Sequence, residues 1–245
     1  MTDINRETRS GLLATGILAG LLACPAASMA ENTASAFTRD GTAVIGAAAL
    51  RAATADERGF TKVLETTLKN SGEPKDLIIG LSFETSLFTE TVVRSKGGSK
   101  STSTADATIE MYVTVDGVMA APEEVIFDRR TQTLWAELGG VLNCNDLNGD
   151  GIVSFDECTL SDEEIGLILD TTAAHSFNFL AYDIGSGSHT IQAYARLSKG
   201  GNVVGECDPD VYAAGECDPG SWDASASLGK GTLAVWEVHG AMASK

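Results

Sequence analysis

The chain has 245 residues and a net charge of −17 at pH 7, from 17 basic and 34 acidic residues. This excess of negative charge disfavours nucleic acids and anionic membranes as partners, so we predict that the protein binds no nucleic acid. The length is sufficient for one large β domain or two small ones, and for a hydrophobic core without other support.

The first thirty residues have the layout of a bacterial-type secretory signal peptide. Two arginines precede a short apolar run at residues 11–23, and the small residues Ser28 and Ala30 offer a cleavage site. The run is too short to span a bilayer, and no other segment is apolar enough to do so. We therefore predict that residues 1–30 are removed, that no membrane span remains, and that the protein is secreted or periplasmic.

A second interpretation of the same segment centres on Cys24. The sequence Leu21-Leu22-Ala23-Cys24 resembles a bacterial lipobox, in which the cysteine carries lipid. That interpretation predicts a lipoprotein anchored at the cell surface through Cys24. The first residue of the exported protein, Glu31 or Cys24, distinguishes the two alternatives.

Alternation of apolar and polar residues predicts a mainly β fold. Residues 31–58 are rich in alanine and threonine and form either an N-terminal arm or a first strand. Beyond them, period-two alternation predicts strands at 63–67, 77–83, 109–115, 125–138, 165–170, 177–181, 189–197 and 233–237. We therefore expect residues 59–245 to form one antiparallel β-sandwich of jelly-roll or Ig-like type.

Two connecting segments carry their own signals. Residues 95–103 are rich in glycine, serine and lysine, which predicts a loop. Ser161 and Glu164 match a capping box, which predicts the start of a short helix.

Twelve residues, 146–157, match the pattern D-x-[DN]-x-[DN]-G-x5-E at every defining position. Calcium takes six to eight oxygen ligands, and alternate residues of a tight loop can direct their oxygens at one centre. Glycine at the sixth position permits the sharp turn that such a loop needs. The predicted calcium ligands are Asp146, Asn148, Asp150, the carbonyl of Ile152, Ser154 and Glu157.

This stretch resembles an EF-hand calcium loop, and the resemblance covers residues 146–157 alone. It implies calcium as the bound ion, with Glu157 as a bidentate ligand and Val153 as the apolar residue that anchors the loop to a core or to a partner loop. The segment before the loop alternates like a strand, whereas an EF-hand has a helix there. No second loop of this kind occurs in the sequence, which favours a structural ion over a sensor.

Four cysteines remain if Cys24 is removed with the leader, and an even number in an exported chain predicts disulfides. Three pairings are possible, of which we favour Cys144–Cys158, bracketing the calcium loop, and Cys207–Cys217. Zinc is a weaker alternative because no C-x2-C pair occurs. The repeated Gly-Glu-Cys-Asp-Pro sequence around Cys207 and Cys217 predicts a disulfide-closed acidic loop, with a second cation site as the alternative.

No motif for a catalytic nucleophile or a metalloprotease occurs, so the sequence favours a protein that is not an enzyme. The leading hypothesis is a secreted calcium-binding protein whose ion orders the rim of a sandwich for adhesion, matrix or surface interaction with a protein or glycan. The alternative is a carbohydrate-binding or carbohydrate-active module with a structural calcium. An exposed row of aromatic side chains would favour that alternative.

Overall fold

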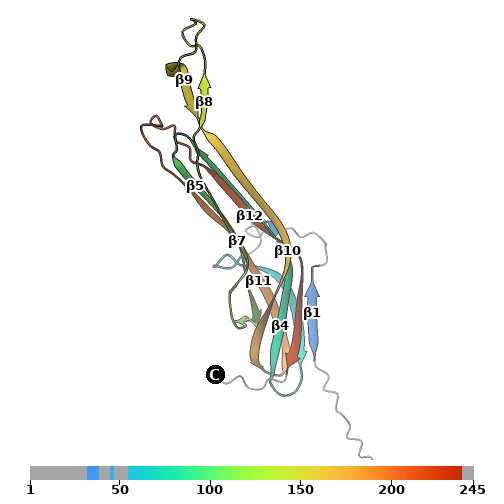
Figure 1. Cartoon of the computed structure of the whole chain (residues 1–245). Helices are drawn as coiled ribbons and strands as arrows, with labels where there is room; N and C mark the ends of the chain where they lie inside the picture. Colours follow the sequence, from blue (N-terminus) through green and yellow to red (C-terminus); the bar gives the residue numbers. More distant parts are fainter. Residues whose placement is uncertain (1–31, 39–44, 47–54, 239–245) are drawn as a thin grey trace, which may run out of the picture. The chain divides into compact units, whose positions relative to one another are not determined.

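The computed structural model describes residues 32–38, 45–46 and 55–238 (Figure 1). The predicted signal peptide and the alternative at Cys24 lie outside these residues. The described elements, in chain order, are β1 (Thr33–Phe37), β2 (Ile45–Gly46), β3 (Thr61–Asn70), β4 (Lys75–Ser95), β5 (Lys100–Val115), β6 (Val118–Met119), β7 (Val125–Glu137), β8 (Val141–Cys144), the 3-10 turn η1 (Phe155–Glu157), β9 (Cys158–Ser161), β10 (Glu163–Ile184), β11 (Gly187–Gly205) and β12 (Gly220–Val238). The prediction of a mainly β fold is confirmed.

The strands form two five-stranded sheets and one separate two-stranded sheet. The first sheet has the order β1-β12-β4-β10, with β2 also paired to β12. The second has the order β3-β11-β5-β6, with β7 also paired to β5, and β8 pairs with β9. Each of these pairings is antiparallel, as the sequence predicted.

Apolar side chains from both large sheets form one hydrophobic core. Leu77, Ile79 and Leu81 of β4 alternate with more exposed neighbours and are fully buried. Ile109 and Met111 of β5 belong to the same core cluster. Burying one face of each sheet against the other explains why the period-two pattern specified these strands correctly.

Beyond Phe83 the buried face of β4 mixes polar and apolar side chains, with threonines interspersed with Leu87 and Val93. Thr85, Thr89 and Thr91 are as buried as the leucines that precede them. Gln132 of β7 satisfies two of them: Thr89 Oγ1 donates to Gln132 Oε1 at 2.7 Å, and Gln132 Nε2 donates to Thr91 Oγ1 at 2.7 Å. The same amide donates to the carbonyl of Leu167 at 2.8 Å, so one side chain of β7 joins β4 and β10.

A second polar side chain of β7 makes similar contacts. The Arg130 guanidinium donates to the carbonyls of Leu87 on β4 and Leu169 on β10, at 2.8 and 3.0 Å. Thr85 Oγ1 donates to Asp128 Oδ2 at 2.6 Å. Polar groups removed from water need such partners, and here the partners lie on the opposite sheet.

The strands are longer than the sequence indicated. The predicted loop at 95–103 is wrong over most of its length, because β4 reaches Ser95 and β5 begins at Lys100. The two strands predicted at 165–170 and 177–181 are parts of the single strand β10. In these regions serine, threonine and alanine replace the large apolar residues on which the pattern depends, although the alternating burial of β4 and β5 continues.

The short helix predicted from Ser161 is also wrong. Ser161 pairs with Val141 in the small sheet, and Glu163 pairs with Ser95 in the first large sheet. Strand pairing on both sides of this point therefore overrides the local capping signal.

Replacing Gln132 by alanine is expected to lower the free energy of unfolding by about 2–4 kcal/mol, because buried hydroxyls lose their partner and a cavity forms. Denaturant unfolding measures this change. Thr133→Ala, on the exposed side of the same strand, is the matched control and should cost less than about 0.5 kcal/mol. Equal effects of the two substitutions would contradict a stabilising role for the buried amide.

Candidate metal centre

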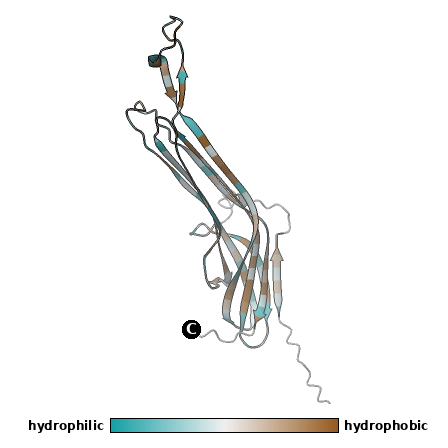
Figure 2. Cartoon of the chain, viewed as in Figure 1, coloured by the Kyte–Doolittle hydropathy of each residue, from teal (hydrophilic) through white to brown (hydrophobic). Residues whose placement is uncertain are grey.

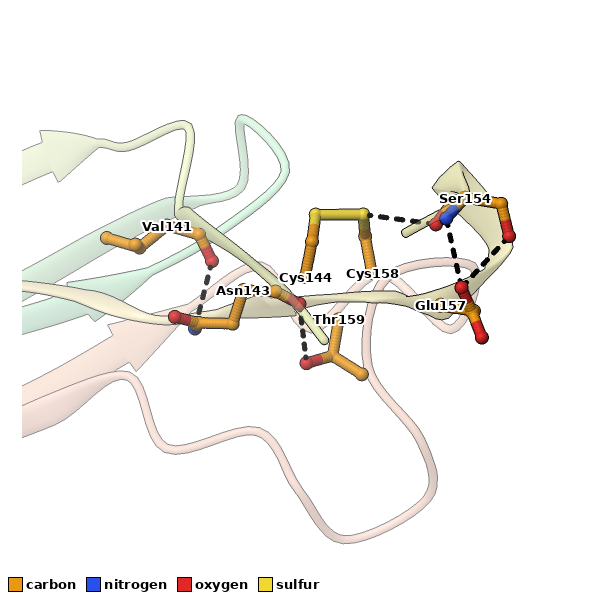
Figure 3. Close-up of a disulfide and its surroundings, with 7 residues drawn as sticks. All are labelled: Val141, Asn143, Cys144, Ser154, Glu157, Cys158 and Thr159. Carbon is orange, nitrogen blue, oxygen red and sulfur yellow. Dashed lines mark hydrogen bonds between the residues drawn. A yellow bond between two sulfur atoms is a disulfide. The ribbon is translucent and has the colours of Figure 1, made fainter. Parts of the chain in front are cut away.

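The predicted calcium loop connects β8 to β9, so the hairpin formed by these strands holds both its ends. Cys144 and Cys158 are directly paired in the register of the hairpin and form a disulfide (Figure 3). Cys207 and Cys217 form the second disulfide. Both predicted pairings are confirmed. The disulfide and the hairpin occupy the positions where an EF-hand has two helices.

Backbone amides and acidic side chains shape the first half of the loop. Asp146 accepts hydrogen bonds from the backbone N–H groups of Gly149 and Gly151 at 2.6 and 2.7 Å. Both glycines have positive φ, 77° and 81°. Gly151 is the sixth residue of the motif, and its left-handed conformation explains why glycine is favoured there.

Glu157 closes the loop from its other end. Its side chain accepts hydrogen bonds from the backbone N–H groups of Leu147 and Asn148, both at 3.1 Å, and from the N–H and hydroxyl of Ser154 at 2.9 and 3.1 Å. Figure 3 shows the Ser154 contact beside the disulfide. These bonds, led by that from the Ser154 backbone, lower the pKa of Glu157, so its carboxylate is ionised at neutral pH.

The remaining predicted ligands also face backbone amides. Asn148 Oδ1 accepts from the N–H of Asp150, and Asp150 Oδ1 accepts from the N–H of Ile152, both at 2.8 Å. Across residues 32–38, 45–46 and 55–238, no three side chains of His, Cys, Asp or Glu are grouped closely enough to hold a metal ion. The structure thus gathers the predicted oxygen donors into one loop, but the carboxylates do not converge on one point.

The apolar residues of the loop face solvent. Val153, expected to anchor the loop, is exposed, and so are Leu147 and Ile152. Phe155, in the 3-10 turn, is 82% exposed. The expectation that Val153 anchors the loop to the core of this chain is therefore wrong, and hydrogen bonds and the disulfide hold the loop instead.

A histidine–aspartate pair that sequence reasoning did not identify lies at a cleft of about 480 Å³ lined by parts of β5, β6, β10 and β11. His189 Nδ1 is 2.7 Å from Asp116 Oδ2, and His189 Nε2 is 3.0 Å from the carbonyl of Gly185. Asp116 raises the pKa of His189 by accepting this hydrogen bond. The hydrogen bond from the Thr190 backbone N–H is the largest cause that lowers the pKa of Asp116, and the hydrogen bond with His189 is the second. Only the adjacency of β5 and β11 brings these residues together.

In the described part of the chain the exposed aromatic side chains are spread over both large sheets and the loop at 146–157; they are Phe37, Trp135, Phe155, Tyr182 and Trp236. Trp135 lies on β7, in one large sheet, whereas Trp236 and Tyr182 lie on β12 and β10, on either side of β4 in the other. Tyr112 and Tyr212 are buried. This distribution lacks the pattern that would favour a carbohydrate-binding face.

Comparisons with protein-family models, with curated proteins and with solved structures found no match to this chain. Among the described residues, no helix is long and apolar enough to cross a membrane. The two disulfides are typical of proteins in oxidising compartments.

The His189–Asp116 pair predicts a pH-dependent contribution to stability. Because the pKa of His189 is raised above 6.5, the contribution of its charged form is present below pH 6.5 and is lost as the pH rises through the raised pKa. Asp116 contributes above its ordinary pKa of 3.8, and this contribution is lost as the pH falls through its lowered value. The pair is therefore strongest between these two limits.

Melting temperatures of the wild type and Asp116→Asn should differ by about 2 °C or more near pH 5.5, and the difference should shrink near pH 9. Asp223→Asn is a suitable control, because Asp223 pairs with a lysine, Lys199, and not with a histidine. A difference between wild type and Asp116→Asn that is the same at both pH values would contradict the assignment.

Proposed function

We propose that this protein is an exported calcium-binding protein in which residues 146–157 bind one structural calcium ion. The proposal rests on one observation: a complete set of oxygen-bearing residues at calcium-loop spacing is confined within a hairpin loop closed by the Cys144–Cys158 disulfide. The loop also provides the positive-φ glycine at its sixth position. The donors are all oxygens, which matches the preference of calcium.

Binding would replace hydrogen bonds within the loop by bonds to the ion. Asp146, Asp150 and Glu157 each accept backbone N–H groups in the structure, so the same oxygens must turn toward a common centre to bind calcium. The rearrangement is confined between the two cysteines, and the three negative charges repel one another until a cation neutralises them. We expect a Kd on the order of 10⁻⁴–10⁻³ M, which millimolar extracellular calcium would saturate.

The effect of calcium should remain local. In the described residues β8 and β9 pair only with each other, so ordering of the loop is weakly connected to the two large sheets. We propose that those sheets, which share one core, form a sandwich of the predicted jelly-roll or Ig-like type. We infer that the ion fixes the shape of a loop used in adhesion, matrix or surface interaction, and that the protein is not an enzyme.

Calcium titration calorimetry on chelator-treated protein tests the proposal. We expect one ion per chain in the wild type and a loss of affinity of about tenfold or more in Glu157→Gln, which removes the bidentate ligand. Asp156→Asn removes the same charge from the neighbouring residue, which is outside the ligand set, and should leave binding nearly unchanged. Absence of binding at millimolar calcium, or equal binding by Glu157→Gln, would refute the proposal.

Removing the Cys144–Cys158 disulfide should weaken calcium binding. Without the cross-link, the ion must supply the cost of ordering the loop, for which chain-entropy estimates give about 3 kcal/mol. A Cys144→Ser/Cys158→Ser double variant should therefore bind calcium at least about tenfold more weakly in the same titration. The Cys207→Ser/Cys217→Ser variant is the matched control. An equal loss in both double variants would indicate a general effect on folding.

A further inference from the structure

The free edge of β10 has an exposed apolar segment. Among the residues that the structure describes, β10 is the last strand of its sheet, with β4 on one side. Four large apolar residues within positions 165–169 of this strand are exposed: Ile165, Leu167, Ile168 and Leu169. Figure 2 shows this apolar stretch in brown near the start of β10. Soluble proteins usually protect such an edge with charges, proline or a covering segment, because it can pair with another strand.

Along the edge of β10 that faces away from β4, the N–H and carbonyl groups that point outward belong to even-numbered residues. The N–H and carbonyl of Leu180 both bond to Ala121, which lies on the side of β10 away from β4. The register between β10 and β4 has no irregularity from Glu163 to Ala181, and strand backbone groups alternate in direction. Gly166, Ile168 and Asp170 therefore direct their N–H and carbonyl groups at the free edge as well.

An antiparallel match of this edge with itself is favourable in one register. With Ile168 opposite Ile168 of a second copy, Leu167 lies opposite Leu169, and both acidic residues of the segment avoid each other. Glu164 then lies opposite Thr172, and Asp170 lies opposite Gly166. Because the backbone of Ile168 faces the free edge, this arrangement also allows the two copies to exchange N–H and carbonyl bonds at the symmetry axis.

The neighbouring registers are less favourable. Moving the symmetry axis to Leu167 places Glu164 opposite Asp170, and moving it to Asp170 places the two copies of Asp170 opposite each other. Like charges directly opposite each other are destabilising in a β ladder. With the axis at Leu169, Ile168 lies opposite Asp170 and the apolar match is lost.

We propose that the protein forms a two-fold symmetric dimer in which β10 pairs with β10 of a second copy around Ile168. The pairing joins the two sheets into one continuous sheet and places Leu167 of each copy beside Leu169 of the other. A two-fold axis makes the contact self-complementary and closed, so association stops at two chains. Each chain carries a charge of −17, so the dimer should tighten as salt screens the repulsion between the copies.

Sedimentation velocity of the full chain, over a range of concentrations and at low and high salt, tests this dimer. We expect a reversible dimer in the wild type and a monomer in Ile168→Asp, because the substitution places two carboxylates opposite each other at the axis. Ile126→Asp on β7 is the matched control, because Ile126 and Ile168 are both 59% exposed. It should dimerise like the wild type. Thermal melts of both variants confirm that they fold.

A charge pair at Thr172 tests the register. Thr172→Lys should tighten the dimer through two contacts with Glu164, and Thr172→Glu should weaken it, by about threefold or more in each direction. Thr133→Lys on β7 changes the net charge equally without touching the edge. A wild type that is monomeric at every concentration and salt level, association that continues beyond two chains, or dimers unaffected by Ile168→Asp would each overturn the proposal.

Discussion

The hydrogen bonds between Gln132 and the buried threonines Thr89 and Thr91 connect the two sheets where β4 passes β7. Near Leu77 and Ile109, apolar side chains hold the sheets together by burial alone. Farther along the strands the core cluster continues with Leu87 and smaller side chains such as Ala105 and Ala107, and an amide, a guanidinium and hydroxyl groups add hydrogen bonds between the sheets. Buried polar groups are costly without partners, so this region is stable only when both sheets are present and in register.

That constraint positions the ends of the loop formed by residues 146–157. Because β7 and β10 are held together by Gln132 and Arg130, the chain leaving β7 and the chain entering β10 are close neighbours. The small sheet of β8 and β9 occupies the connection between them, and its disulfide fixes the ends of the loop. Where an EF-hand has two packed helices, residues 146–157 are held by one strand pair with four paired residues and by one disulfide.

The parts of the fold that the sequence predicted correctly are those where side-chain size reports burial. Alternation of leucine, isoleucine and valine located the core of β4, β5 and β11, and the spacing of the cysteines indicated both disulfides. Threonine and serine are usually exposed, so the sequence does not reveal that Thr89, Thr91 and Ser103 are buried. The ends of β4 and β5 that contain these residues were therefore not predicted. The pairing of His189 with Asp116 was also missed, because it depends on two strands that are distant in the sequence. The donors of the loop were identified from spacing alone, whereas their present hydrogen bonds to backbone amides were not.

The polar contacts between the sheets have a consequence for how this sequence can change over time. A leucine in an apolar core can be exchanged for isoleucine or methionine with modest loss, because the neighbours tolerate similar volumes. An amide that donates to one hydroxyl and accepts from another has no such substitutes. Positions 89, 91 and 132 should therefore vary together among related sequences, although more than forty residues separate β4 from β7 at these points. Joint variation at these positions would record the contact between the sheets.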